Sequence, residues 1–207
     1  MLFAWGASFL FMRIASPELG PVFTTELRVT IAGAALLLYA LLTRRKLGLL
    51  KHWKSFLLLG AINAALPFTL ICMAELHLSA SLAAILNATT PMFAALAAWG
   101  TRKEKPGAAK SVGLIIGLVG VGVLVGWSPL PLTSTVLLSV GYSLGAALCY
   151  AFGGLYASRV GSGLTPLALA AGQQLGASVV LLPLAVLFLP RIICLLPPLY
   201  ILSSASR

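Results

Sequence analysis

The residues best suited to hold a small ligand lie within one apolar stretch, at Asn87-Ala88-Thr89-Thr90-Pro91. Pro91 has no N–H, and its ring leaves the carbonyl of Asn87, four residues earlier, without its helical hydrogen bond. Asn87, Thr89 and Thr90 place polar side chains around this break. Inside a bilayer, broken helices are tolerated where protein buries them or where they line a watery cavity. We favour a substrate site here over the alternative, a proline kink whose free carbonyl is satisfied by the threonine hydroxyls.

A similar motif with fewer polar residues occurs earlier in the chain, where Asn63 lies four residues before Pro67. Its amide could supply a hydrogen bond near the carbonyl that the proline frees. A substrate-binding role and a purely structural role are equally supported for Asn63. Neither proline motif would be sufficient alone to predict a substrate site.

Arg28 is the charged residue that lies deepest in an apolar stretch, about six residues or ~9 Å from its start at 1.5 Å per residue. An arginine at the centre of a membrane helix costs ~2.5–3.5 kcal/mol on insertion scales. Glu26 is two positions away and points to another face, so the two cannot pair on one helix. Arg28 therefore needs a partner on another helix, a cavity, or an escape to the outer interface. A role in substrate binding and a structural role are equally supported.

Three further residues could contribute to a site: Trp5 and Ser8 in the first apolar stretch and Tyr150 in the sixth. An interior Trp could stack on a ligand, but an aromatic side chain that packs on lipid or on a neighbouring helix is commoner. Arg13 is expected to extend to the interface. Glu75, at the outer end of the third stretch, is interpreted as an interfacial residue without a role.

No catalytic set accompanies these residues. The chain has no Asp, no His pair, no paired membrane carboxylates and no phosphate-binding loop, and its three Cys show no metal or redox spacing. We expect neither an enzyme nor a cofactor nor a metal site.

Long apolar segments must position these residues. The chain has 207 residues, of which 60% are hydrophobic and 9% charged, whereas soluble domains are near ~25% charged. About 20 helical residues cross a bilayer core of ~30 Å. On that measure the sequence predicts an all-α, polytopic transmembrane helix bundle. The seven predicted spans are 1–16, 22–43, 56–74, 80–100, 111–127, 135–157 and 165–189.

Positive charges fall in alternate loops between these spans. The loops after the second, fourth and sixth spans hold ten Lys and Arg, and the loops after the first, third and fifth hold none. Because cytoplasmic loops are enriched in Lys and Arg, the even-numbered loops and the N-terminus are predicted to be cytoplasmic. The net charge of +10 belongs to these loops, which face anionic lipid headgroups, so no nucleic-acid partner is expected.

An internal repeat is indicated at an offset of 145 residues, which aligns Trp5 with Tyr150, Pro21 with Pro166, and Arg28 with Gln173. Five spans separate the two copies, and an odd number inverts the second copy in the membrane. Inverted repeats of this kind are found in many secondary transporters.

Small residues mark the fifth span as a packing helix. Gly113 and Gly117, and then Gly122 and Gly126, stand four residues apart, a spacing that allows close approach of two helices. The contact could be made within the chain or between subunits, and it therefore permits a homodimer. We do not expect this span to touch substrate.

Several of these motifs together resemble the EamA-type transporters of the drug/metabolite transporter superfamily. The Asn87–Pro91 stretch is the most specific of them, and the resemblance covers roughly residues 3 to 190. The other motifs that carry it are Trp5-Gly6-Ala7-Ser8-Phe9 running to Arg13, Arg28 early in its span, Leu66-Pro67-Phe68, and Gly113 to Val125.

The resemblance implies ten helices in two inverted five-helix halves, a bacterial inner (plasma) membrane location, and transport of small metabolites, often by export of amino acids or related compounds. It implies a central cavity formed by the spans that correspond to 1, 3, 4 and 6. The residues that it would place near this cavity are Trp5, Ser8, Asn63, Asn87, Thr89, Thr90 and Tyr150.

Together these observations predict a secondary transporter that works by alternating access, with membrane lipid and a small-molecule substrate as partners. The alternative is a non-transporting, truncated membrane fragment that at most associates with other helices, because only about seven of ten spans are present. We divide the chain into a first five-helix repeat (1–127), a partial second repeat of two helices (135–190), and an atypical tail (191–207).

Overall fold

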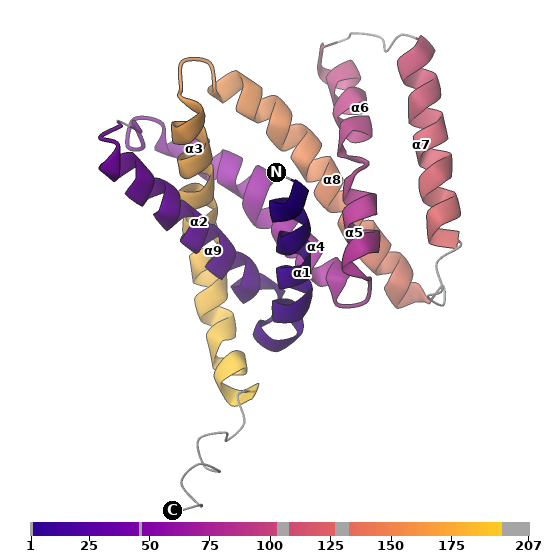
Figure 1. Ribbon diagram of the computed structural model, residues 1–207, viewed down its shortest axis with the longest axis horizontal. Coiled ribbons are helices and arrows are strands. Elements are labelled where there is room, and N and C mark those ends of the chain that lie inside the picture. The colour runs from indigo at the N-terminus through magenta and orange to yellow at the C-terminus, as the bar shows by residue number, and fades with distance from the viewer. Residues whose placement is uncertain (1, 46, 103–107, 127–132, 196–207) are drawn as a thin grey trace, which may run out of the picture.

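The predicted apolar spans are helices in the computed structural model, and two of them are interrupted (Figure 1). The structure describes residues 2–45, 47–102, 108–126 and 133–195, and in these ranges it contains helices and no strand. The predicted all-α, polytopic membrane bundle is thereby confirmed. The helices are α1 (Leu2–Leu19), α2 (Pro21–Leu42), α3 (Trp53–Gly60), α4 (Leu66–Glu75), α5 (Ala80–Asn87), α6 (Thr90–Arg102), α7 (Ala108–Gly126), α8 (Ser134–Val160) and α9 (Pro166–Leu195).

Five helical stretches of the described chain are long and apolar enough to cross a membrane. One of them combines α3 with α4, and another combines α5 with most of α6. Their bounds are Pro21–Leu42, Trp53–Glu75, Ala80–Gly100, Ser134–Val160 and Pro166–Phe188.

Both interruptions fall beside a proline that cannot donate to the helical ladder. Between α3 and α4 the chain forms a π-helical turn, Ala61–Ala65, immediately before Pro67. Between α5 and α6 the helix stops at Asn87 and begins again at Thr90, beside Pro91. Because proline removes one hydrogen bond and displaces the carbonyl four residues earlier, each helix widens or breaks there.

One predicted boundary was wrong, and one helix extends beyond its predicted span, which itself agrees with the apolar stretch Pro166–Phe188. The first turn was expected at Pro17, but α1 includes Pro17 and ends at Leu19, and the chain reverses at Gly20. Gly20 has φ 77, a conformation that glycine adopts without steric cost. At the other end, the helix expected to stop by Pro190 continues as α9 to Leu195. The remaining residues of the predicted tail, 196–207, lie outside the described part of the chain.

The main core lies where α1, α2, α4, α5, α8 and α9 meet. Side chains from all six helices form one buried cluster, and α7 stands apart at one edge of the bundle (Figure 1). The members of this cluster are Phe9, Met12, Val29, Ala64, Ala65, Phe68, Ile71, Cys72, Ala83, Ala146, Ala177 and Leu181.

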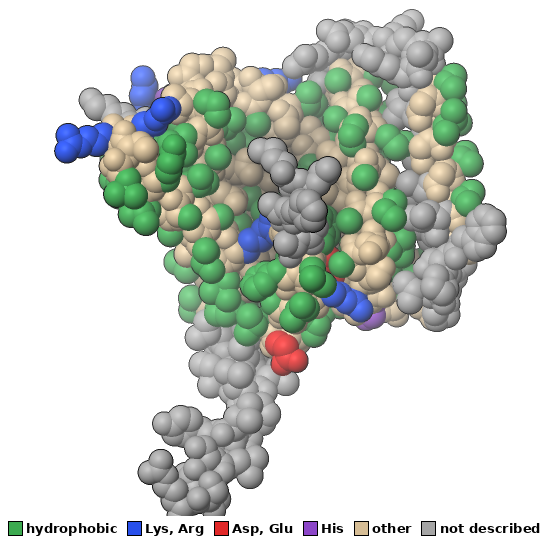
Figure 2. All heavy atoms as spheres, in the orientation of Figure 1, with side chains coloured by type: hydrophobic (Ala, Val, Ile, Leu, Met, Phe, Trp, Pro, Cys, Tyr) green, Lys and Arg blue, Asp and Glu red, His purple; other side chains and the backbone are tan. Residues whose placement is uncertain are grey.

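The connections that were predicted to be cytoplasmic lie at one end of the bundle. The α2–α3 and α8–α9 connections are at the top of Figure 1, and the α1–α2 and α4–α5 connections are at the opposite end. Figure 2 shows Lys and Arg side chains gathered beside the α2–α3 connection, while apolar side chains cover the flanks. The exposed cations there include Arg44, Arg45, Lys51 and Lys54. The bundle therefore separates a cationic end from apolar sides, as a membrane protein must.

Candidate functional site

Arg28 lies inside the bundle and is held by residues of two other helices. Its Nη1 donates a hydrogen bond to Ser8 Oγ of α1 and lies 3.5 Å from the sulfur of Met12. Its guanidinium carbon lies 4.0 Å from the centre of the Phe68 ring on α4. A cation over an aromatic face is stabilised by about 0.5–2 kcal/mol, which offsets part of the cost of an arginine at this depth. The partner that the sequence required for Arg28 is thus supplied by α1 and α4.

Tyr150 of α8 joins this group through the same aromatic ring. The rings of Phe68 and Tyr150 meet edge to face with their centres 6.0 Å apart. The Tyr150 hydroxyl is buried and has no hydrogen-bond partner among the described residues. Three of the predicted site residues, Ser8, Arg28 and Tyr150, are therefore brought into one cluster, which we call the Arg28 cluster, together with Met12 and Phe68.

Asn63 lies in the π-helical turn and forms a reciprocal pair with Gln173 of α9. Asn63 Nδ2 donates to Gln173 Oε1 at 2.9 Å, and Gln173 Nε2 donates to the Asn63 carbonyl at 3.4 Å. That carbonyl is the one that Pro67 leaves without a helical donor. The Asn63 side chain also packs directly on the backbone of Gly153 in α8. These contacts supply the structural role that the sequence left open for Asn63.

At the α5–α6 break, both threonine hydroxyls bond to the backbone. Thr90 Oγ1 donates to the Asn87 carbonyl at 2.6 Å, and Thr89 Oγ1 donates to the Leu86 carbonyl at 2.7 Å. Thr90 thus satisfies the carbonyl that Pro91 leaves without a helical donor, as the proline-kink interpretation of this motif requires. The Pro91 ring itself is exposed. The Asn87 side chain differs, because its Oδ1 is buried without a partner among the described residues. Asn87 is thus the member of the motif with a side-chain oxygen that no described residue satisfies.

The remaining predicted positions are less informative. Trp5 lies on α1, but its side chain is outside the described part of the structure. Gly117 faces the Met92 side chain of α6, whereas Gly113, Gly122 and Gly126 have open space where a Cβ would stand. Among the described residues, no hydrogen bond joins the Arg28 cluster to Asn63 or Asn87, so the predicted residues form three separate groups.

Sequence reasoning missed four residues that the structure makes prominent. Gln173 was visible only as the counterpart of Arg28 in the internal repeat. Glu75 was interpreted as interfacial, yet its side chain is fully buried and both carboxylate oxygens lack a partner among the described residues. Arg13, expected to reach the interface, donates to the backbone carbonyls of Glu75 and Leu78. Glu26 accepts a hydrogen bond from Ser178 of α9, a contact that no local sequence pattern predicts.

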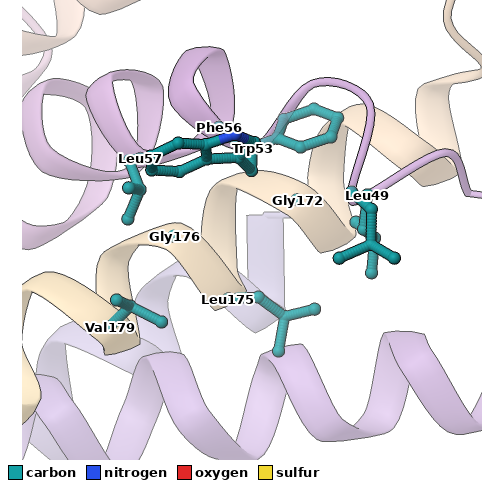
Figure 3. Close-up of a pocket in the computed structure, with 9 residues that line it drawn as sticks. Leu49, Trp53, Phe56, Leu57, Gly172, Leu175, Gly176 and Val179 are labelled. Carbon is teal, nitrogen blue, oxygen red and sulfur yellow. The ribbon is translucent and has the colours of Figure 1, made fainter.

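A cavity of about 230 Å³ lies away from these groups, between the α2–α3 connection, α3 and α9 (Figure 3). Its walls are apolar, with Trp53 and Phe56 of α3 on one side and Gly172 and Gly176 of α9 on the other. A second cavity of about 540 Å³ adjoins it through Leu49 and Leu50. Neither of these two cavities contains a predicted site residue. In the described residues, no group of three His, Cys, Asp or Glu side chains could hold a metal ion.

Known proteins provide an independent comparison. The uncharacterized transporter YdfC of Bacillus subtilis is 33% identical over 121 residues, which cover 58% of this chain and 40% of YdfC. The uncharacterized inner membrane transporter YedA of Escherichia coli is 28% identical over 185 residues, covering 86% of this chain and 57% of YedA. The uncharacterized transporter YvbV of Bacillus subtilis is 27% identical over 184 residues, covering 88% of this chain and 59% of YvbV.

The chain thus spans about half the length of the curated relatives that it matches. No solved structure matches it. The model of one family, described as the EamA-like transporter family, matches residues 1–126, which is more than half of the chain. That match, together with the transporter names of these three relatives, agrees with the multi-pass bundle described above. The chain belongs to the EamA-like transporter family.

Proposed function

We propose that this chain carries out secondary transport of small polar metabolites across the bacterial inner membrane by alternating access. Family membership and the names of its relatives support a membrane transporter. The observation that favours a ligand inside the bundle is the Arg28 cluster. A positive charge lies there between α1, α2 and α4; the Glu75 carboxylate interacts with it electrostatically, and no acidic side chain forms a salt bridge with it among the described residues.

The chemistry of the unpaired groups favours an amino acid or a related compound with a carboxylate. A guanidinium has five N–H donors in a fixed fork that suits a carboxylate. Among the described residues, Nη1 is the only nitrogen of Arg28 that donates hydrogen bonds, so the N–H groups of Nη2 and Nε are free to bind a ligand. The buried Asn87 Oδ1 is an acceptor that suits an ammonium group, and the Tyr150 hydroxyl can donate or accept.

The two interrupted helices supply the places where such a bundle would bend. In many secondary transporters the broken helices lie at the substrate site, and one half of the protein rocks against the other. Here the π-helical turn and the α5–α6 break each carry an asparagine, Asn63 and Asn87, four residues before a proline. We propose that the cationic end is cytoplasmic and that a homodimer, where one forms, uses the open glycine face of α7.

Flux measurement in proteoliposomes tests the proposal. The reconstituted chain is expected to exchange labelled amino acids or related carboxylates, and Arg28→Gln is expected to reduce that flux at least tenfold because the carboxylate loses its charged partner. Arg45→Gln is the matched control, since Arg45 is an exposed cation in the α2–α3 connection. Flux that is equal in wild type and Arg28→Gln would contradict the role of Arg28.

The same experiment separates the transporter from the alternative function. A chain that inserts and folds but gives no flux over a panel of amino acids, nucleosides and cationic drugs would favour the non-transporting membrane fragment. In that case, the association of the chain with other helices would be its remaining activity.

A further inference from the structure

The cavity of about 230 Å³ between α3 and α9 is an apolar groove that follows a membrane-spanning helix (Figure 3). Four residues of α9 line it at positions i, i+3, i+4 and i+7, and they therefore share one face of the helix. These residues are Gly172, Leu175, Gly176 and Val179. The stretch from Gly172 to Val179 extends ~10 Å along α9 at 1.5 Å per residue. This cavity, which we call the α3–α9 groove, thus runs from the α2–α3 connection along the length of a membrane span.

The α3–α9 groove opens on the outside of the bundle. Several of the side chains that line it are themselves exposed: Trp53 is 53% exposed, Val179 62% and Leu50 92%. Every residue that lines the groove is apolar or glycine, apart from the indole N–H of Trp53. On the flank of a membrane bundle such a surface meets hydrocarbon, which is as apolar as the leucine side chains beside it. An acyl chain is therefore the kind of group that suits this groove.

Two positive charges stand where the groove reaches the α2–α3 connection. The second cavity, of about 540 Å³, shares Leu49 and Leu50 with the α3–α9 groove and lies on the α2 side of them. Arg45 and Lys51 line this second cavity, and both residues are exposed. The rest of its wall is apolar or glycine. A continuous apolar surface thus ends at a pair of cations.

The described chain supplies no anion to these cations. Residues 43–52 contain no Asp or Glu. The acidic residues of the described chain are Glu18 at the end of α1, Glu26 in the second turn of α2, and Glu75 at the end of α4. The ends of α1 and α4 lie at the opposite end of the bundle (Figure 1). A phosphate from outside the chain would be complementary to Arg45 and Lys51, since both side chains are phosphate binders.

The connection is packed onto the bundle, so these charges have a defined place beside the groove. Leu47 is 8% exposed and packs with Ala40 of α2 and Ala168 of α9. The Lys51 N–H donates to the Gly48 carbonyl at 3.2 Å, which closes a turn. Gly48 has φ 60, a conformation that glycine adopts without steric cost. The backbone that carries the two cations is therefore fixed by a turn and by a buried leucine.

Trp53 marks the level at which headgroups would lie. Its ring lines the α3–α9 groove, and Lys54 Nζ lies 5.6 Å from the centre of that ring. Tryptophan is enriched where the bilayer meets water, with its ring at the level of the headgroups. The cations of the connection are thus at headgroup level, and the groove extends from there into hydrocarbon.

We propose that an anionic phospholipid binds at this place, with its phosphate at Arg45 and Lys51 and an acyl chain in the α3–α9 groove. Basic pockets beside membrane helices are known to bind anionic headgroups. Here the cations select the negative charge and the groove selects the chain, so neither a free phosphate nor a neutral lipid satisfies both parts. The bound lipid would stabilise the crossing of α3 and α9. The site depends on the membrane bundle and needs no transport activity.

Native mass spectrometry of the purified full chain, titrated with phosphatidylglycerol or phosphatidylethanolamine of identical acyl chains, tests the headgroup part. Wild type is expected to bind phosphatidylglycerol at least roughly fivefold more tightly, as one basic residue near an anionic headgroup contributes about that much. The double variant Arg45→Gln/Lys51→Gln should lose about tenfold or more of this affinity. Arg159→Gln is the matched control, because Arg159 is an exposed cation at the same end of the bundle that lines neither cavity.

A second pair of variants tests the acyl chain. Val179→Trp fills the groove without a change of charge and is expected to weaken the binding of both lipids. Val186→Trp is its control: Val186 is 57% exposed, lies two turns further along α9 and does not line the groove. Unchanged binding in Val179→Trp would overturn the proposal, since the chain would then lie elsewhere.

Three other outcomes would also overturn the proposal. Equal binding of the two lipids by wild type would mean that the lipid is unspecific. Full competition by glycerol 3-phosphate would mean that a phosphate binds without a chain. A dimer that forms as lipid is lost, and that Val179→Trp abolishes, would assign the groove to a second copy of the chain. If the double variant does not fold, the exposed single change Lys51→Gln decides, with a loss of roughly fivefold expected.

Discussion

Glycines line two regions of this molecule at similar spacing, and they serve opposite purposes there. Where α3 and the π-helical turn cross α9, Gly60, Gly172 and Gly176 allow contact between backbones. A Cβ on Gly172 would stand 2.5 Å from the Phe56 ring, and one on Gly176 would overlap the Phe56 carbonyl. On α7, Gly122 and Gly126 have nothing within 4 Å of the same position. The first region is a tight helix crossing, and the second is an open face.

The difference shows that small-residue spacing identifies a helix able to pack and does not identify its partner. Gly172/Gly176 and Gly122/Gly126 are both four residues apart. Among the described residues, only the first pair meets another helix, because Phe56 and its backbone fill the groove that these glycines leave. The α7 face is available to lipid or to another subunit.

The largest effect is expected from Gly176→Ala. The added methyl would overlap the Phe56 carbonyl, a backbone atom that cannot move aside, so we expect a loss of about 3 kcal/mol or more in the free energy of unfolding. Thermal unfolding in detergent measures this loss. The matched change Gly122→Ala adds the same methyl in open space and is expected to be neutral or slightly stabilising, because alanine favours helix. Equal destabilisation by both changes would contradict the distinction between a tight crossing at Gly176 and an open face at Gly122.

A smaller loss is expected when the polar pair beside this crossing is broken. Asn63→Leu removes the donor to Gln173 Oε1, while Gln173 Nε2 keeps the backbone carbonyl of residue 63, so we expect a cost of about 1–2 kcal/mol in a membrane interior. A double-mutant cycle with Gln173→Leu should give a coupling energy of about 0.5–1.5 kcal/mol. Gln174→Leu is the control: its Oε1 is already buried without a partner among the described residues, so its removal should cost nothing.

A smaller loss in the free energy of unfolding is expected when a hydrogen bond at the α5–α6 break is removed. Thr90→Val keeps the shape of the side chain but removes the hydrogen bond to the Asn87 carbonyl, and membrane hydrogen bonds of this kind average about 0.6 kcal/mol. Chemical unfolding in mixed micelles is sensitive enough to detect that change. Ser158→Ala removes a comparable bond to the Leu155 carbonyl at an exposed position and should have less effect. The idea that Thr90 satisfies the break fails if Thr90→Val is fully neutral.

The smallest effect on stability is expected on α7. Gly122→Leu should leave the free energy of unfolding within about 0.5 kcal/mol, as for substitutions at exposed sites. If α7 forms a homodimer, the bulky side chain should nevertheless lower the yield of crosslinked dimer in membranes. Ile116→Ala, which trims an exposed apolar side chain of the same helix, is the comparison. A large drop in monomer stability would contradict this assignment, because it would mean that Gly122 packs against another part of the chain.

Much of the fold follows from sequence because hydropathy and proline act locally. The breaks at Asn63–Pro67 and Asn87–Pro91 were predictable, since a missing N–H affects the carbonyl four residues earlier whatever surrounds it. The partners of these groups were not predictable, because Gln173 lies 110 residues from Asn63 in the chain. Glu75 was misjudged for a related reason. Its place at the end of an apolar span suggested the interface, whereas in the fold Arg13 of α1 reaches the Glu75 backbone and the Glu75 side chain is buried.

The π-helical turn has one consequence for how the third span tolerates insertions and deletions. A single residue more or less rotates everything that follows in a helix by about 100°. The extra residue accommodated in Ala61–Ala65 lets one continuous span face α9 with its first half and α8 with its second. Deleting Ile62 would restore an ordinary helical pitch and leave Phe68 on the side of the helix that faces the Arg28 guanidinium. The third span can therefore lose one residue at this turn without rotating its second half relative to α8.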